Sequence, residues 1–241
     1  MKREVQEQIV SIADARFSRF STSASSQHGI AAPRFMLGSQ TRQISGTVSW
    51  LAQVPCGGIT GINDYRLIGD TASLADLHLR PGYAHGRWVH GIARFGTQVH
   101  ALSAVGGGCH YAVVQSADVP PSTRSLFDCG GVFTTPTSIN GAHPPGSATG
   151  ALNMVWRAGR LELHGHLEVR VEGDAARLAI IQYGVLPGAI CRGGSPIGGS
   201  HYELVLALDG RGMLRCVVLY RAQFARGALY QGVAVFDADG S

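Results

Sequence analysis

The sequence predicts a mainly β protein, with an antiparallel β-sandwich body of the jelly-roll kind and a short amphipathic helix at its N-terminus. Segments with the two-residue alternation of strands follow one another closely in the C-terminal third. Glycine makes up 33 of 241 residues, about twice its usual share, which suits a chain with many turns. Charged residues are only 15%, against about 25% in a typical soluble domain. That low charge argues against a helical bundle.

Residues 1–22 are expected to form a helical attachment segment. Apolar residues such as Val5 and Ile9 recur near the 3.6-residue period of a helix within residues 2–20, and the other face is polar. A lone helix of this length is marginal in water, so it must pack against the body, sister copies or a partner. The small polar residues that follow predict a flexible linker over residues 23–40.

The middle of the chain is less regular. Residues 41–133 predict an irregular β module, with strand candidates that include Ile44–Val54 and Trp88–Phe95. Residues 134–149 are rich in threonine, proline and glycine and predict a long loop. This loop either divides two β modules or lies at the tip of one.

The clearest β pattern lies in residues 150–241, which predict an antiparallel, jelly-roll-like sandwich module. Between Leu161 and Val171, apolar residues alternate with polar ones, as in a half-buried strand. Asp209 and Gly210 separate two apolar runs, which is a strong hairpin signal. Several such runs at short spacing favour an antiparallel sandwich over a parallel α/β sheet.

Charge and cysteine content exclude several partners. The formal net charge of +4 is small for this length, and no basic run is present, so no nucleic-acid partner is expected. No apolar stretch approaches the roughly 18 residues of a membrane span, and no secretory signal is visible. Five cysteines without a CxxC motif predict reduced, buried thiols rather than a zinc site. One or two disulfides formed outside the cell are the alternative.

Seven residues are candidates for ligand binding. They are Tyr83, His85, Arg87, Trp88, His143, Arg192 and Tyr202. The first four lie in a glycine-rich segment expected to be a loop, and the others lie in expected loops at 134–149 and 187–202. Aromatic faces and planar donors suit the apolar patches and hydroxyls of a sugar ring. The alternative interpretation places Trp88 in the core and makes its segment a mere connection.

The sequence offers one candidate metal pair and no catalytic motif. His164 and His166 share a face of one expected strand, although two histidines also occur on wet sheet faces without a metal. Cys109 and His110 could form a nucleophile and its base, but adjacent strand residues point to opposite faces. No serine elbow, phosphate-binding loop or dinucleotide fingerprint is present. We therefore expect no cofactor and no enzymatic activity.

A helical N-terminal segment, a polar linker and a glycine-rich, charge-poor β body form a layout that resembles the fibre, spike and receptor-binding proteins of tailed bacteriophages. The strands of the last third are similar to the jelly-roll or TNF-like tip domains of those proteins. The His-x-His pair is similar to pairs that bind iron in trimeric tail fibres. The resemblance implies a homotrimer on a virion, assembled in the host cytoplasm and exposed outside the cell. Its helix would bind other virion proteins, and its tip a bacterial surface glycan or protein.

Low charge beside 45% apolar residues also favours an obligate oligomer, because subunit contacts hide apolar surface. Two other functions stay open. One is a structural baseplate, collar or head-decoration protein of a phage-like particle, with its surfaces buried by neighbours. The other is a polysaccharide hydrolase that uses carboxylates the sequence does not single out.

Overall fold

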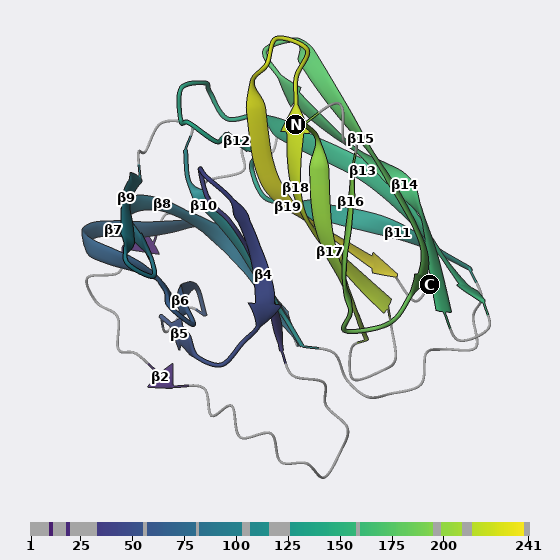
Figure 1. Ribbon diagram of the computed structural model, residues 1–241, viewed down its shortest axis with the longest axis horizontal. Helices are drawn as coiled ribbons and strands as arrows, with labels where there is room; N and C mark the ends of the chain where they lie inside the picture. Colours follow the sequence, from purple (N-terminus) through teal and green to yellow (C-terminus); the bar gives the residue numbers. More distant parts are fainter. Residues whose placement is uncertain are drawn as a thin grey trace, which may run out of the picture.

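The fold consists of two antiparallel β-sheets that lie side by side (Figure 1). The computed structural model describes residues 10–11, 18–19, 33–54, 57–80, 82–102, 107–115, 126–157, 160–194, 199–208 and 214–238. Every described element is a strand, and every described strand pair is antiparallel. The prediction of a mainly β, antiparallel fold is therefore confirmed.

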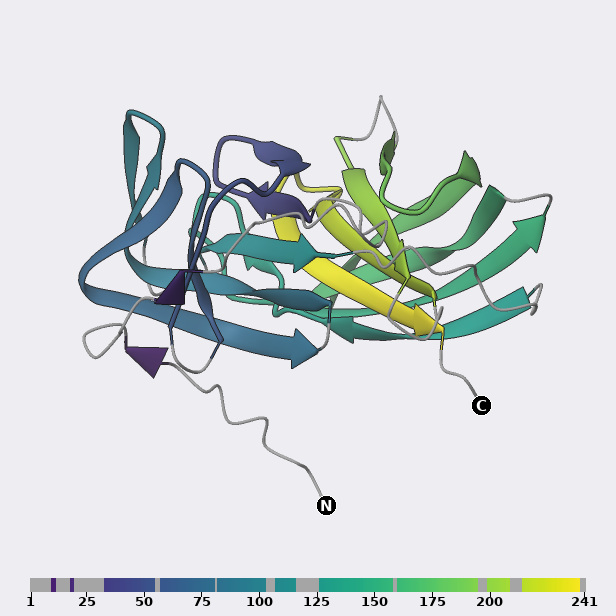
Figure 2. The same cartoon turned by 90° about the horizontal axis from the view of Figure 1, so that it is seen from below.

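The first ten strands form one sheet, here called the N-terminal sheet. They are β1 (Val10–Ser11), β2 (Ser18–Arg19), β3 (Arg34–Gly38), β4 (Gln43–Thr47), β5 (Leu51–Gln53), β6 (Ile59–Ile62), β7 (Tyr65–Arg80), β8 (Tyr83–Phe95), β9 (Gln98–Leu102) and β10 (Cys109–Val114). Their order is β2-β5-β6-β7-β8-β10-β3-β4, with β1 on β7 and β9 on β8. The sheet curls around a core in which Ile59, Trp88 and Tyr111 are fully buried (Figure 2).

The last nine strands form the C-terminal sheet. They are β11 (Leu126–Phe133), β12 (Thr137–Ser138), β13 (Ser147–Arg157), β14 (Arg160–Val171), β15 (Asp174–Val185), β16 (Ile190–Gly194), β17 (His201–Leu208), β18 (Leu214–Gln223) and β19 (Leu229–Ala238). Their order is β15-β14-β13-β11-β19-β18-β17-β16, with β12 on β19. Glu172 and Gly173 both have positive φ between paired Val171 and Asp174, the pattern of a two-residue hairpin turn.

The two sheets share a buried wall. Side chains of β18 alternate between the core of the C-terminal sheet, which receives Cys216 and Val218, and a second cluster that receives Val217 and Leu219. That cluster also contains Met36 and other residues of the N-terminal sheet, so it packs the sheets together. A strand buried on both faces carries no polar alternation, and all of β18 except its last residue is buried.

The helix expected over residues 2–20 is wrong at the four residues described there. Val10–Ser11 is a strand paired with β7, and Ser18–Arg19 is a strand paired with β5. The rest of the expected attachment segment, 1–22, lies outside the described residues. Pairing with strands of the sheet satisfies the backbone hydrogen bonds of these residues. Such long-range pairing overrides the local helical periodicity on which the expectation rested. Among the described residues, no helix is long and apolar enough to cross a membrane.

The segment boundaries also differ from those expected. The N-terminal sheet ends with β10 at Val114, and the C-terminal sheet begins with β11 at Leu126. Strand β3 falls within the expected linker, residues 23–40, and pairs with both β10 and β4. The expected loop, residues 134–149, contains β12 and the beginning of β13. The division between the sheets therefore precedes that loop.

Candidate functional site

The segment expected to be a glycine-rich surface loop is the first half of β8. Tyr83, His85 and Arg87 are 5%, 2% and 3% exposed, and Trp88 is fully buried. Trp88 lies in the core of the N-terminal sheet, where its Nε1 donates a 2.7 Å hydrogen bond to the carbonyl of Ile59. The expectation of a surface loop is therefore wrong, and the alternative that placed Trp88 in the core is confirmed.

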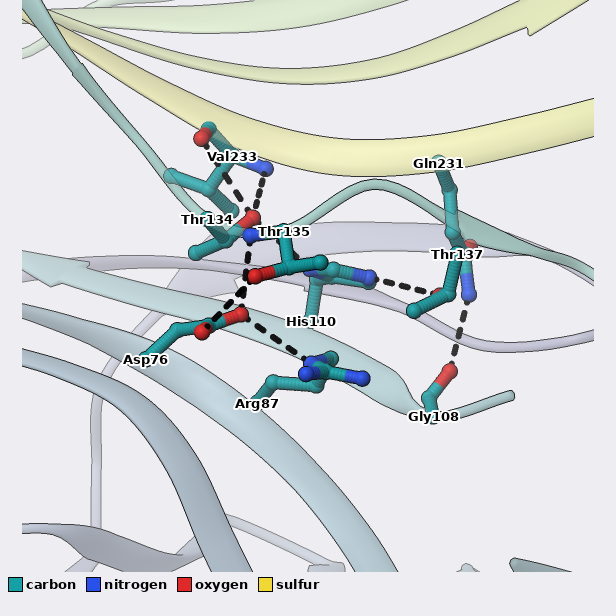
Figure 3. Close-up of polar contacts among 9 residues, drawn as sticks. All are labelled: Asp76, Arg87, Gly108, His110, Thr134, Thr135, Thr137, Gln231 and Val233. Atoms are coloured by element: carbon teal, nitrogen blue, oxygen red, sulfur yellow. Dashed lines mark hydrogen bonds and ion pairs between the residues drawn. The ribbon is translucent and has the colours of Figure 1, made fainter. Parts of the chain in front are cut away.

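Arg87 belongs to a polar network between the sheets (Figure 3). Its Nε donates a 3.1 Å hydrogen bond to Asp76 Oδ2. The same carboxylate accepts a 2.8 Å bond from the Thr135 backbone N–H and a 3.0 Å bond from the Thr135 hydroxyl. Asp76 has a φ of 53°, in the left-handed region. The network joins β7 and β8 to the segment after β11, so it fastens the sheets together.

His110 lies next in this network and is fully buried. Each ring nitrogen lies 2.9 Å from a hydroxyl, Nδ1 from Thr134 and Nε2 from Thr137. Burial, with smaller contributions from Arg87 and His85, holds the pKa of His110 well below its usual value, so the ring is neutral. Its neighbour Cys109 faces the core of the N-terminal sheet, where burial raises the pKa of the thiol to about 12. These two residues therefore do not form a nucleophile–base pair.

Three rings stack beside the network. His78, Tyr83 and His85 have centroids between 5.2 and 5.8 Å apart, and the guanidinium of Arg215 lies 4.0 Å above the Tyr83 ring. Burial is the main cause that lowers the pKa of His85 to about 3 and raises that of Tyr83 to about 12. Because His85 and Tyr83 are almost fully buried, this cluster stabilises the interface between the sheets, and Tyr83 also lines a cavity of the N-terminal sheet.

Three of the sequence candidates line cavities: Tyr83 one on the N-terminal sheet, Tyr202 a hollow of about 640 Å³ beside β15 and β16, and His143 an open cavity at an end of the C-terminal sheet. We call this cavity of about 220 Å³ the end hollow; its walls are His143, Val171, Glu172, Asp174, Phe224, Arg226, Ala228 and Tyr230. A second hollow of about 320 Å³ shares Glu172, Asp174 and Arg226 with it. The two hollows therefore adjoin along one charged edge.

Two aromatic rings support the end hollow. Phe224 and Tyr230 lie edge to face, with centroids 5.1 Å apart. The Tyr230 hydroxyl donates a 2.9 Å hydrogen bond to the carbonyl of Pro144, which ties the loop carrying His143 to β19. Burial and, to a smaller extent, Glu172 raise the pKa of Tyr230. The neutral phenol therefore keeps this bond throughout the neutral pH range.

Short turns hold the charged groups of the end hollow. The turn at Glu172 leads into Asp174, whose Oδ1 accepts a 2.9 Å hydrogen bond from the Ala175 N–H. Arg226 lies in a turn closed by a 2.8 Å bond from the Phe224 N–H to the Ala228 carbonyl. Among the described residues, no carboxylate forms an ion pair with Arg226. Its guanidinium can therefore meet a ligand.

Arg192 and Tyr202 line other surfaces. Tyr202 is 2% exposed; its hydroxyl donates to the Ile181 carbonyl at 3.2 Å and accepts from the Gln182 side chain at 3.1 Å. These bonds bridge β15 and β17, which are not neighbours in the sheet. Arg192 is exposed and donates to Glu203 at 2.7 Å. The seven candidates therefore do not gather at one site.

His164 and His166 lie on the outward face of β14, where both are half-buried. The His164 ring packs edge-on against Tyr183, with centroids 5.3 Å apart. Within the part of the chain that the structure describes, no three histidine, cysteine, aspartate or glutamate side chains are grouped to hold a metal. Gly165 separates the histidines because a Cβ there would lie 2.2 Å from the Ala151 carbonyl oxygen.

Sequence reasoning missed most of the end hollow. Glu172, Asp174, Phe224 and Arg226 come from two turns more than 50 positions apart, and Tyr230 comes from a strand. The sequence feature that could have indicated this site is the pair Arg226 and Gly227, which forms a turn signal between two apolar runs. No family model, curated protein or solved structure matches this chain.

Proposed function

We propose that this protein is a non-enzymatic binding protein that holds a saccharide in the end hollow and the adjoining hollow. One observation carries the proposal: Arg226, which forms no ion pair among the described residues, shares an edge of the hollows with two carboxylates, Glu172 and Asp174. Carboxylates accept hydrogen bonds from sugar hydroxyls, and a guanidinium donates to ring and hydroxyl oxygens. Phe224 and Tyr230 are only 5% and 1% exposed, so they form the buried backing of the hollow and leave sugar recognition to the charged edge.

A bacterial surface glycan is the ligand class we favour, with the chain acting as a fibre, spike or receptor-binding protein of a tailed phage. The jelly-roll likeness of the C-terminal sheet is part of this proposal. Its support is the all-β scaffold, with the charged groups on short turns at the end of a sheet. Rigid scaffolds of this kind present binding residues on their connecting segments.

The test is binding of the full chain to arrays of purified bacterial lipopolysaccharide and capsular oligosaccharides, followed by calorimetry on the best ligand. We expect Arg226→Ala to weaken binding at least tenfold. The matched control is Arg157→Ala, which removes the same charge from an exposed strand end outside the hollows. An array without any bound glycan would contradict the proposal. Release of new reducing ends, abolished by Glu172→Gln, would identify a hydrolase instead.

A second observation favours self-association, and we propose a homotrimer. The outward face of β11 and β15 exposes Leu126 at 52%, Val132 at 36%, Ile181 at 52% and Tyr183 at 67%. Strands β13 and β14 lie between β11 and β15 in the sheet, so contacts between subunits would cover these side chains at two separate places. Light scattering should give a single oligomer that dissociates in the double variant Ile181→Asp, Tyr183→Asp. Val99→Asp, at an equally exposed position of β9, is the control. A wild-type monomer at micromolar concentration would refute this part.

A further inference from the structure

The N-terminal sheet has a cavity of its own at one end. Its volume is about 240 Å³, and its apolar walls come from Val48, Leu51, Ile59, Leu79, Ala84 and Val113. These residues come from several strands around the curled sheet, with β5, β6, β7, β8 and β10 each contributing. The cavity is therefore built by the tertiary fold and not by one loop.

The rim of this cavity is polar. Gln53, Arg80 and Gln115 stand at its edge. Arg80 Nε lies 3.3 Å from His78 Nε2 and donates to it. Burial first, and the Arg80 charge next, lower the pKa of His78, so the imidazole is neutral and can accept this bond. The bond holds the guanidinium at the rim.

Among the residues that the structure describes, no carboxylate neutralises that guanidinium. None of the ion pairs among the described residues includes Arg80. The side chain is exposed, so its remaining N–H donors can meet a solute. A cation at the mouth of an apolar cavity attracts a ligand with an anionic group at one end and an apolar body at the other.

Leu79 supplies the matching apolar contact at the mouth. Leu79 is 45% exposed. Its side chain also packs closely against Gly57, so that a Cβ added to that glycine would lie 2.3 Å from Leu79 Cδ1. Covering exposed leucine surface removes apolar area from water, which favours binding. A ligand that enters the cavity past Leu79 gains this contribution in addition to the ion pair.

We propose that this cavity binds an amphiphilic carboxylate, with its apolar chain inside and its carboxylate on Arg80. The site lies on the N-terminal sheet and does not depend on the end hollow. The chain enters past the exposed Leu79 side chain, and Gln53 and Gln115 donate to the carboxylate from the rim. An acyl chain is the ligand class that fits a cavity of about 240 Å³ with apolar walls and one cation at the opening.

The experiment is calorimetric titration of the full chain with decanoate, decanol and butyrate below their aggregation limits. We expect decanoate to bind more tightly than decanol and much more tightly than butyrate. Arg80→Gln should weaken decanoate at least tenfold and leave decanol unchanged, and Leu79→Gln should weaken both. Arg157→Gln, the exposed control, should change neither. Arg226→Ala should leave decanoate binding intact, which separates this site from the saccharide site.

Three results would overturn the proposal. The first is no heat of binding with decanoate. The second is equal weakening of decanoate binding by Arg80→Gln and Arg157→Gln, which would indicate a general charge effect. The third is equal affinity for decanoate and butyrate, which would show that the apolar walls take no part.

Discussion

The buried guanidinium of Arg87 donates a 3.1 Å hydrogen bond to the carboxylate of Asp76, which is held in the left-handed backbone region. The two side chains are 4% and 13% exposed. Because Asp76 also accepts two bonds from Thr135, one carboxylate links β7 and β8 to the segment that follows β11. This link fixes the relative position of the two sheets together with the apolar cluster between them.

Replacing Asp76 by alanine should therefore destabilise the whole fold. The change removes the carboxylate from a buried ion pair, and such a loss costs about 3–5 kcal/mol of unfolding free energy. Urea unfolding followed by circular dichroism measures the cost. Asp128→Ala, at an exposed position of β11, should change stability by less than about 0.5 kcal/mol. Equal effects of the two substitutions would show that the Asp76 network is not structural.

Stability should fall as the pH drops below about 6.5. The folded protein keeps His85 and His110 neutral, with the pKa of His85 near 3, whereas both imidazoles in the unfolded chain take up protons near pH 6.5. Between these values the unfolded state binds more protons, so each histidine removes about 1.4 kcal/mol of stability per pH unit. The free energy of unfolding should be measured with urea between pH 7 and pH 5. Carboxylates usually titrate below this range, so the change in stability reports on the histidines.

The variant His85→Phe tests that assignment. It keeps an aromatic ring in the stack but removes the titrating group, so the dependence of unfolding free energy on pH should become shallower. His143→Gln, which changes an exposed histidine away from the stack, is the control substitution. A slope that His85→Phe does not alter would contradict the burial of a neutral imidazole at this position.

Gly165 should tolerate no side chain. A Cβ would lie 2.2 Å from the Ala151 carbonyl oxygen and 2.8 Å from Leu152 Cα, and both contacts are with backbone that cannot move aside easily. Gly165→Ala should cost about 1–3 kcal/mol by overpacking. Gly130 on β11 is the matched control, because a Cβ there meets nothing within 4 Å. Thermal melting of both variants compares their stabilities. Equal melting temperatures would refute the close approach of the Ala151–Leu152 backbone to Gly165.

Patterns within single strands were predictable from the sequence. The alternation between Leu161 and Val171 corresponds to β14, and the Asp209–Gly210 signal lies between β17 and β18, which pair from Leu208 to Leu214 onward. Strand β7 escaped detection because its pairing with β8 shifts register at three places, so it shows no clean alternation. The buried wall shared by the two sheets depends on tertiary packing. Because both faces of β18 are buried in it, that strand lacks the alternating polar residues that a strand with one face in solvent would show.

The candidate site was less predictable than the fold. His143 was found because it lies in a segment rich in turn residues, whereas Arg226 was not singled out. The aromatic and basic residues of β8 gave the stronger local signal, but a strand between two packed sheets buries them. Residue type alone does not distinguish a buried polar network from a binding surface, since both use arginine, histidine and tyrosine.

Backbone amide shifts during titration with a bound saccharide test the central claim most directly. We predict that the largest shifts fall on Glu172, Gly173, Asp174 and Arg226, which border the two hollows. The amides of Arg80 and Gln115, at the other cavity, should stay unchanged. Shifts spread evenly over both sheets, or centred on the separate hollow lined by Ile181 and Gly193, would contradict a saccharide site at the end of the C-terminal sheet.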